Sequence, residues 1–441
     1  MDHVAFASIG RLSSLIDDGQ LDPVDLLEVY LDRIAGVGKP LNAFVALRED
    51  KARAEAHGAR ERSRRQVRLG PLDGIPIALK DNIDIAGSPT ANGMGGAPRF
   101  AEADAAVAWR LKQAGAVLLG KLNMHEGALG GTTDNPHFGR THNPYRIGYS
   151  PGGSSGGAGA AVAAGLCAAA LGTDTAGSIR LPASYCGVVG FKPTYQRIST
   201  SGIVPLSRRL DHVGPLSRTV GDAGLLLEAL ASGHCPVTLL PTPGSLSGRV
   251  VCVLDNFASE TITAEVTHSF ESTLDLMAGL GARIMHTTLS EFDPQAVRYA
   301  MFLLTEAGAA FEHGEALDLD RSRFSEGFAR CVQYGRRMSA MQLLAQENRI
   351  AMAAEQMLAC FGTADIIASP ATPQSAFSFE QDGLTNLNTF CTLASFAGCP
   401  AISLPMGRDA EGLPHGLQMM GPVGQDETLL AIAGAFEAAA N

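Results

Sequence analysis

The segment from Tyr149 to Gly177 is rich in glycine and other small residues, and it constrains the fold more than any other stretch of the chain. Within it, residues 152–157 read Gly-Gly-Ser-Ser-Gly-Gly. Glycine adopts backbone conformations that other residues refuse, so two serines between paired glycines indicate a tight turn. Glycine-rich loops often bind phosphate, but this one lacks the Gly-Lys-Ser/Thr ending of a P-loop and a well-placed Gly-x-Gly-x-x-Gly motif. By itself the segment therefore indicates a glycine-rich turn and no particular ligand.

A third serine, Ser178, lies at the end of a second run of small residues. Residues 171–180 read Leu-Gly-Thr-Asp-Thr-Ala-Gly-Ser-Ile-Arg. Small side chains leave several backbone N–H groups free to converge near the Ser178 hydroxyl. An oxyanion hole requires such an arrangement.

Upstream, the apolar segment 74–80 is expected to be a strand, and it ends on Lys80. A lysine in this place usually extends its amine to water or pairs with an acid. Asp81 follows directly, but on an extended segment its side chain should point to the opposite face. If Lys80 is buried without an acid partner, its pKa falls because desolvation disfavours the charged amine. A neutral amine can act as a base.

Strand and helix patterns alternate along the chain, as is typical of an α/β fold. The first clear helix is expected to begin at Asp22 and Pro23, an N-cap residue followed by proline at the first helical position. The other segments expected to be regular are a helix over 104–114, strands over 116–119, 249–254, 366–368 and 401–404, and a final helix from Asp426.

The pattern of predicted secondary structure changes after the proline-rich stretch 236–247. Residues 248–362 show long helical patterns with one clear strand, and the end of the chain returns to short buried strands. We expect a single domain over 1–441 whose core comes from 70–222 and 364–441, with a more helical middle segment over 248–362.

The composition is that of a large globular core, with 46% hydrophobic residues among 441. A net charge of −11 argues against nucleic-acid binding, because phosphate contacts need clustered basic residues. The eight cysteines form no Cys-x-x-Cys pair, which favours reduced thiols and a cytoplasmic location. No signal segment is recognisable at the N-terminus, and the most apolar stretch, 157–171, is too short to span a bilayer.

Together, the lysine strand and residues 152–180 resemble the amidase signature family. The resemblance is dense over 70–222, where it includes Gly-Phe-Lys-Pro-Thr at 190–194 and Leu-Asp-His-Val-Gly-Pro at 210–215. It returns near the end as Ser-Pro-Ala-Thr-Pro at 369–373 and Gly-Cys-Pro-Ala-Ile-Ser-Leu-Pro at 398–405. This resemblance implies an α/β/α sandwich with a central mixed sheet flanked by helices. It also implies a hydrolase that acts on linear amide C–N bonds and needs no metal or other cofactor.

The resemblance further implies a Ser–cisSer–Lys triad. Ser178 would be the nucleophile, Ser154 the bridging serine preceded by a cis peptide bond, and Lys80 the base. The expected oxyanion hole consists of the backbone N–H groups of Thr175, Ala176, Gly177 and Ser178. The residues expected to brace this site are Ser155, through a hydrogen bond within its loop, and the charged residues Asp174, Arg180 and Asp211. The histidines expected to have packing roles only are His125, His137, His142 and His212.

Three other interpretations compete with a free-standing amidase. Residues 152–156 satisfy the Gly-x-Ser-x-Gly pattern of the nucleophile turn in an α/β-hydrolase, and His415 could complete its triad. That turn must follow a buried strand, however, and the sequence of residues 143–149 is not that of a buried strand. The A subunit of glutamyl-tRNA amidotransferase shares the whole signature and releases ammonia from glutamine for a partner protein. Its tyrosine-rich segment has no counterpart at 334–344. An inactive binding scaffold is disfavoured because all three triad positions are present.

The substrate is expected to be a small carboxamide or ureido compound. The texture of 300–373 weakly resembles the carboxybiuret-hydrolase branch of the family, which handles small ureido acids. The segments expected to set specificity are the loop before Thr90, residues 124–135, the helical segment 292–350 and the loop 377–388. No membrane or nucleic-acid partner is expected, whereas a homodimer or a small accessory subunit is possible.

Overall fold

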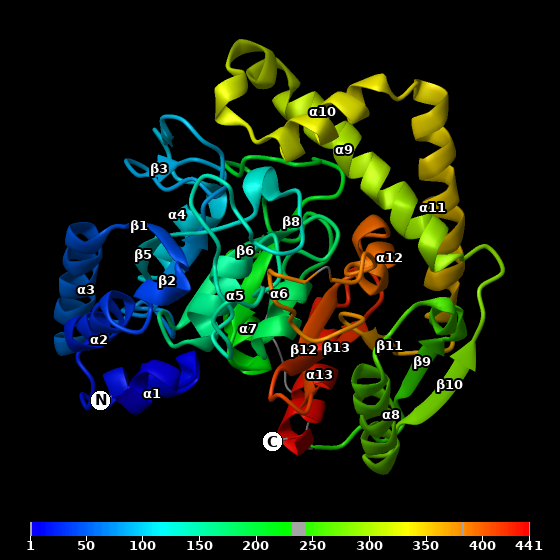
Figure 1. The fold of residues 1–441 in the computed structure, drawn as a ribbon. Coiled ribbons are helices and arrows are strands. Elements are labelled where there is room, and N and C mark those ends of the chain that lie inside the picture. The colour runs from blue at the N-terminus through cyan, green and yellow to red at the C-terminus, as the bar shows by residue number, and fades with distance from the viewer. Residues whose placement is uncertain (1, 232–243, 382, 441) are drawn as a thin grey trace.

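The structure is a computed structural model that describes residues 2–231, 244–381 and 383–440. One mixed sheet of eleven strands runs through this part of the chain (Figure 1). From one edge of the sheet to the other, the strands are β1 (Phe44–Leu47), β5 (Val117–Leu122), β2 (Pro76–Lys80), β6 (Ala169–Asp174), β8 (His212–Ser217), β7 (Val189–Lys192), β12 (Ala401–Arg408), β13 (Pro414–Met420), β11 (Ile366–Pro370), β9 (Val250–Leu254) and β10 (Arg283–Thr287). Strands β5, β2 and β6 are mutually parallel, as are β11, β9 and β10, whereas the strands between these groups pair antiparallel.

Helices cover both faces of this sheet, which confirms the α/β/α sandwich (Figure 1). The described helices are α1 (Ile9–Asp17), α2 (Pro23–Ala35), α3 (Glu49–Arg64), α4 (Ala106–Gln113), α5 (Gly156–Ala163), α6 (Arg180–Cys186), α7 (Val220–Leu230), α8 (Ala264–Gly279), α9 (Pro294–Leu319), α10 (Glu326–Arg337), α11 (Ala340–Cys360), α12 (Thr392–Phe396) and α13 (Asp426–Ala440). Strand β2 shows how the layers form, because successive side chains of a strand point to opposite faces. Ile77 and Leu79 pack in one core with α4 and α7, whereas Ala78 packs in another with α3 and α5.

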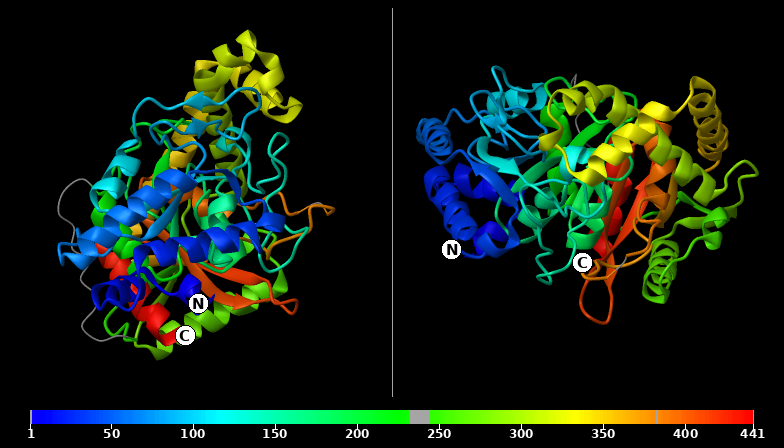
Figure 2. Two further views of the ribbon diagram at one scale, coloured as in Figure 1. Left: turned by 90° about the vertical axis from the view of Figure 1, so that its left-hand side faces the viewer. Right: turned by 45° about the horizontal axis from the view of Figure 1, so that its top comes forward.

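The sheet joins two pieces of sequence that lie far apart in the chain. Strand β7 pairs with β12, so the strands within 76–217 and 366–420 form one continuous surface. Helices α10 and α11 pack on α9, and the three lie together at one end of the sheet (Figures 1 and 2). This arrangement sets the long helix α9 over the turn that follows β6. That the whole chain is a single domain stays a prediction.

The expected elements are present with shifted ends. Asp22 caps α2, where its carboxylate accepts a hydrogen bond of 2.8 Å from the backbone N–H of Val24. The expectation of one strand within 248–362 was wrong, because β10 pairs with β9 in that segment. Strand β10 lies at the edge of the sheet, and its residues Arg283 and His286 are exposed. Because it therefore lacks a continuous apolar run, the sequence does not predict it as a strand.

No helix in the described part of the chain is long and apolar enough to cross a membrane. Seven cysteines there are free thiols, and Cys235 lies outside the described residues. Most of the proline-rich stretch expected to separate the segments, residues 236–243, also lies outside them.

The glycine-rich segment is explained by close packing of backbone on backbone. Gly157 is the second residue of α5, and a Cβ atom added there would lie 2.4 Å from the carbonyl oxygen of Asn123 and 2.8 Å from that of Ala43. Its own N–H donates to the same Asn123 carbonyl at 3.1 Å. Neither backbone oxygen can rotate away, so α5 can approach the turn after β5 this closely only with glycine at this position.

We predict that Gly157→Ala lowers the free energy of unfolding by roughly 1–3 kcal/mol, because an added methyl group overpacks the contact. The matched control is Gly10→Ala in α1, where an added Cβ meets nothing within 4 Å. That change should stabilise the protein by about 0.5–1 kcal/mol, because glycine is unfavourable inside a helix. Urea unfolding followed by circular dichroism measures both. Equal effects of the two substitutions would contradict this account of the segment.

Candidate active site

The structure brings together Lys80 and Ser154, which lie 74 residues apart in the sequence. Lys80 ends β2 and is completely buried. Its Nζ donates hydrogen bonds to the Oγ of Ser154 at 2.7 Å and to the Oγ1 of Thr173 at 2.8 Å. The peptide bond between Gly153 and Ser154 is cis. The lysine amine therefore contacts two hydroxyl groups, one of them from the serine pair.

The acid next to Lys80 in the sequence is engaged elsewhere. Asp81 accepts hydrogen bonds of 3.2 Å from the N–H groups of Ala91 and Gly93, and it pairs with the Nζ of Lys121 at 3.3 Å. In the described ranges, no carboxylate lies within ion-pair distance of Lys80. Burial lowers the pKa of Lys80 to about 7, although the more distant charges of Asp174 and Asp211 act in the opposite direction. Burial thus favours the neutral form of this amine.

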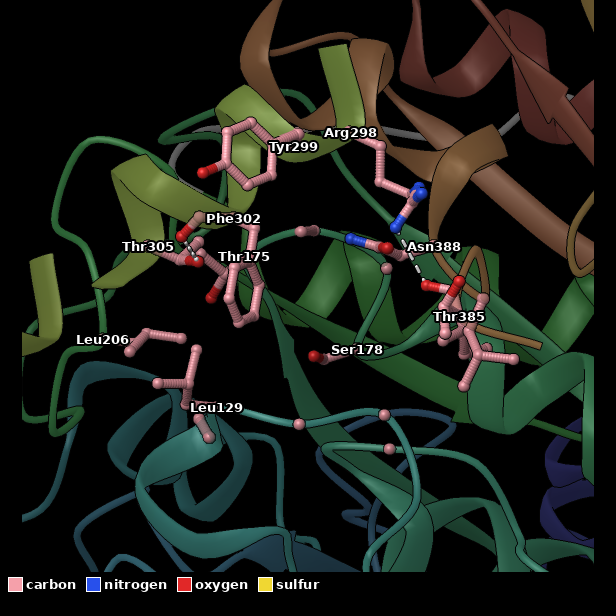
Figure 3. Close-up of a pocket in the computed structure, with 18 of the residues that line it drawn as sticks. Leu129, Thr175, Ser178, Leu206, Arg298, Tyr299, Phe302, Thr305, Thr385 and Asn388 are labelled. Carbon is pink, nitrogen blue, oxygen red and sulfur yellow. Dashed lines mark hydrogen bonds between the residues drawn. The ribbon is translucent and has the colours of Figure 1, made fainter. Parts of the chain in front are cut away.

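Ser178 lies in the turn between β6 and α6, and it is the partly exposed member of the three expected catalytic residues. Its side chain points into a cavity of about 340 Å³ (Figure 3). Its carbonyl accepts a hydrogen bond of 3.2 Å from the N–H of Ser155, which ties this turn to the serine pair. Gly153 lines the same cavity. No hydrogen bond joins the Ser178 and Ser154 hydroxyls among the contacts of the described residues.

A buried ion pair braces the Ser178 turn. The Asp174 carboxylate accepts hydrogen bonds from the N–H groups of Gly177 at 2.6 Å and Ile179 at 3.1 Å. It also accepts from Nε and Nη2 of Arg180, at 3.0 and 2.9 Å. Burial alone would raise the pKa of Asp174, but the Arg180 charge and hydrogen bonds outweigh burial and hold the pKa well below its usual range. Both residues therefore contact the Ser178 turn, and their bracing role stays a prediction.

One part of the expected oxyanion hole needs correction. The N–H of Gly177 points at Asp174 and is not free to meet a substrate oxygen. The N–H groups of Thr175, Ala176 and Ser178 donate to no acceptor in the described part of the chain. The physical reason is the short loop, because a carboxylate placed three residues before an N–H readily accepts from it. The available donors are therefore three of the four expected.

The other two expected supporting residues occupy different positions around the turn. Asp211 accepts from the Thr175 hydroxyl at 2.7 Å and from the N–H groups of Leu206 and Ser207. Burial raises the pKa of Asp211 to about 6, and these hydrogen bonds partly offset the effect. Among the contacts of the described residues, the Ser155 hydroxyl forms no hydrogen bond within its own loop, contrary to expectation. Its Oγ donates to the Thr173 carbonyl of β6 at 3.1 Å.

The α/β-hydrolase interpretation is contradicted by the position of its histidine. His415 lies on β13, between the hydroxyls of Ser269 at 3.0 Å and Ser375 at 2.8 Å. Ser154 instead bonds to Lys80, as described above. The four histidines expected to pack contact neighbouring groups as follows: His125 the Thr132 hydroxyl, His137 the Glu126 carboxylate, His142 the Gly148 N–H, and His212 the carbonyls of Leu210 and Asp174.

Three of the four segments expected to set specificity line the cavity. They contribute Ala128 to Gly131, the α9 residues Arg298, Tyr299, Phe302 and Thr305, and the loop residues Leu384, Thr385, Leu387 and Asn388. The loop before Thr90 does not contribute, because Lys121 holds it elsewhere through the Pro89 carbonyl and the Thr90 hydroxyl. Sequence analysis missed Leu181 and Leu206, since an isolated leucine carries no signal of its surroundings. In residues 2–231, 244–381 and 383–440, no group of three or more His, Cys, Asp and Glu side chains is arranged to hold a metal ion.

Comparison with known proteins identifies the family. The family model described as Amidase matches residues 25–430. The chain belongs to the amidase family. It is therefore a hydrolase of amide C–N bonds, as the sequence predicted.

Among curated relatives, the chain is similar to the A subunit of glutamyl-tRNA(Gln) amidotransferase from Synechococcus sp. (strain CC9311). The two are 37% identical over 478 aligned positions, which cover 98% of this chain and 97% of the relative. The corresponding protein of Streptomyces coelicolor is 34% identical, with coverage of 100% and 97%.

Solved structures of amidases share the fold. A crystal structure of an amidase has a TM-score of 0.92 and 33% identity, covering 99% of this chain and all of that one. A chain from a vestigial protein complex, connected with the evolutionary origins of an s-triazine catabolic enzyme, has a TM-score of 0.89 and 31% identity, covering 98% of both chains. The peptide amidase of Stenotrophomonas maltophilia has a TM-score of 0.83 and 29% identity, with coverage of 98% and 97%.

We predict that Arg180→Leu lowers the free energy of unfolding by about 3–5 kcal/mol, because it leaves the Asp174 carboxylate buried without its counter-ion. Arg64→Leu is the control, since Arg64 pairs with Glu61 on the exposed face of α3 and such pairs contribute little. Urea denaturation measures both variants. If Arg180→Leu cost no more than the control, the ion pair could not be what holds the Ser178 turn.

Proposed function

We propose that the chain is an amidohydrolase that cleaves a small carboxamide or ureido C–N bond through a seryl acyl-enzyme. Ser178 attacks the carbonyl carbon, and its proton passes through the Ser154 hydroxyl to the neutral amine of Lys80. The N–H groups of Thr175, Ala176 and Ser178 stabilise the tetrahedral oxyanion. The proton then returns through Ser154 to the leaving nitrogen, which departs as ammonia or an amine. Water finally releases the acid from Ser178 by the same route.

The observation that carries this proposal is the setting of the Lys80 amine. A general base works best when its pKa lies near the working pH and when it is within hydrogen-bond reach of the proton it takes. Burial without a carboxylate partner supplies the first condition, and the 2.7 Å contact with Ser154 supplies the second. When the amine is neutral, the Ser154 hydroxyl can donate to it, while Thr173 accepts one of its N–H groups.

The cavity supports a small substrate. Its volume of about 340 Å³ is at the lower end of the range usual for ligand pockets. Leu129, Leu206 and Phe302 form an apolar wall on one side of Ser178, and polar groups of Arg298 and Asn388 lie on another side (Figure 3). A compact acyl or ureido group fits this space better than a long lipid or peptide chain.

The second candidate function is that of a glutaminase subunit that feeds ammonia to a partner. It is favoured by the amidotransferase relatives, which align with nearly the whole chain. The segment 334–344, expected to distinguish the two functions, lies at the end of α10 and the start of α11, and it does not line the Ser178 cavity. Glutamine therefore belongs in any test of substrates. A homodimer or an accessory subunit stays an expectation for either function.

We predict that Ser178→Ala abolishes both amide turnover and covalent labelling by a fluorophosphonate. The screen should measure ammonia release from aliphatic and aryl carboxamides, ureas, carbamates and glutamine. Ser375→Ala is the control, because Ser375 is another partly buried serine that bonds to a histidine. Labelling that persisted in Ser178→Ala would refute the nucleophile assignment. Turnover restricted to glutamine would favour the amidotransferase function instead.

We predict that Lys80→Met and Lys80→Arg each lower the acylation rate by about 10²–10⁴-fold or more, since loss of one general base has this effect. Arginine cannot substitute, because it stays charged. In the parent protein, kcat/KM should rise with pH through about 7 as Lys80 loses its proton. Lys112→Met, which removes a surface partner of Asp104, is the control. Near-normal turnover by Lys80→Met would disprove the triad.

The titration of Lys80 should also change the free energy of unfolding with pH, and this measurement does not depend on activity. The unfolded chain holds the lysine proton up to about pH 10.4, whereas the folded chain releases it near 7. Between these values the unfolded state binds more protons, so the free energy of unfolding rises with pH. The Lys80→Met protein should lack this contribution. Parallel stability curves for the two proteins from pH 7 to 10 would show that the Lys80 pKa is not depressed.

A further inference from the structure

One arginine in the cavity wall has hydrogen-bonding groups that the protein leaves unused. Arg298 projects from α9 on the same side of the cavity as Thr385 and Asn388 (Figure 3). Its Nη1 donates to the Thr385 carbonyl at 3.0 Å, which fixes the plane of the guanidinium group. Its Nε is buried and has no acceptor within the described ranges. The edge formed by Nε and Nη2 is therefore not used by any described residue.

The charge of Arg298 is also unmatched nearby. No described carboxylate lies within 4 Å of its nitrogen atoms, although three acidic residues border an adjoining cavity of about 630 Å³ that Arg298 also lines. Of these, Glu260 already accepts a hydrogen bond of 2.7 Å from Asn386. Asp255 and Asp293 also lie on that outer side, and Asp293 caps the start of α9. Towards Ser178 the cavity wall is largely apolar, so the described residues supply no counter-ion for this half-buried guanidinium group on that side.

We infer that Arg298 binds a carboxylate group of the substrate. The inference rests on the proposed function, which places the scissile carbonyl at Ser178. The Nε and Nη2 edge of a guanidinium group presents two parallel N–H bonds that match the two oxygens of a carboxylate. The Asn388 amide lies on the same side of the cavity and offers a further donor (Figure 3). The substrate class is thus a small amide or ureido acid.

Binding by Arg298 would distinguish substrates that differ only in the charge of the group next to it, although the triad would cleave them equally well. A neutral amide of the same length leaves the Arg298 edge unpaired, and a substrate with a cationic group there is repelled. Because charge-assisted, two-point hydrogen bonds are strong in a partly desolvated site, the acid should be favoured by on the order of 10²-fold.

The first experiment compares monoamides of malonic, succinic and glutaric acids with the corresponding diamides. In the parent protein, at least one acid should exceed its diamide in kcat/KM by on the order of 10²-fold. Arg298→Gln should bring this ratio close to one. Arg298→Lys should leave an intermediate ratio, because lysine keeps the positive charge but lacks the two parallel N–H donors of the guanidinium group. Arg283→Gln on the edge strand β10 is the matched control and should keep the parent ratio.

The second experiment measures binding without turnover. In the Ser178→Ala protein, titration calorimetry should show that the preferred monoamide acid binds more tightly than its diamide, and adding Arg298→Gln should remove the difference. An acid-to-diamide ratio unchanged by both Arg298 substitutions would overturn the inference while leaving Ser178-dependent turnover intact. Turnover that survived in Ser178→Ala would instead refute the proposed function, and the binding comparison would still test Arg298. Circular dichroism checks that each variant is folded.

Discussion

The buried pair of Asp174 and Arg180 is the interaction on which the rest of the site depends. Asp174 holds the backbone of the turn after β6, and Arg180 extends the contact to the second piece of the core. The Arg180 guanidinium donates to the Oε1 of Gln418 on β13 at 2.7 Å and to the Oγ of Ser395 on α12 at 2.7 Å. A buried ion pair is worthwhile only when its remaining hydrogen-bonding groups are also satisfied, as they are here. The position of Ser178 is therefore fixed by residues more than two hundred positions downstream.

Burial by itself does not single out the base. Burial also lowers the pKa of Lys192 to about 7, and it lowers the pKa of Lys121, where the charge of Asp81 opposes the shift. The Lys192 amine donates to the carbonyls of Pro193 and Cys399, which have no proton to give. Lys121 contacts the Thr90 hydroxyl, but it is paired with the Asp81 carboxylate. Lys80 differs because it has no such carboxylate and because the Ser154 hydroxyl that it contacts belongs to the turn beside the cavity. The chemistry of the neighbours, more than the depressed pKa, distinguishes a base from a structural lysine.

Local patterns allowed much of the fold to be predicted, and the resemblance to the amidase signature family supplied the roles of the three central residues. Lys80, Ser154 and Ser178 lie in short segments whose composition is unusual in itself, and the Asp22 cap needs only two adjacent residues. The features that were missed depend on tertiary structure. The Gly177 N–H donates to the Asp174 carboxylate, whose orientation follows from its ion pair with Arg180. Strand β10 forms because it pairs with β9. Arg298 looks like an ordinary helix residue until the loop at Thr385 shows where its side chain points.

The groups proposed for catalysis and those proposed for substrate recognition come from different parts of the fold, the first from the sheet and its turns and the second partly from helix α9. The groups proposed for catalysis come from strand ends and a glycine-rich turn, where backbone contacts leave almost no freedom for substitution. The groups proposed for recognition include Arg298, Phe302 and Thr305, which follow one another along a single face of α9 at intervals of four and three residues. Substitutions on that stripe alter the cavity without touching the sheet. Natural drift or a small combinatorial library confined to it could therefore change which amide is accepted while the bond-breaking groups stay the same.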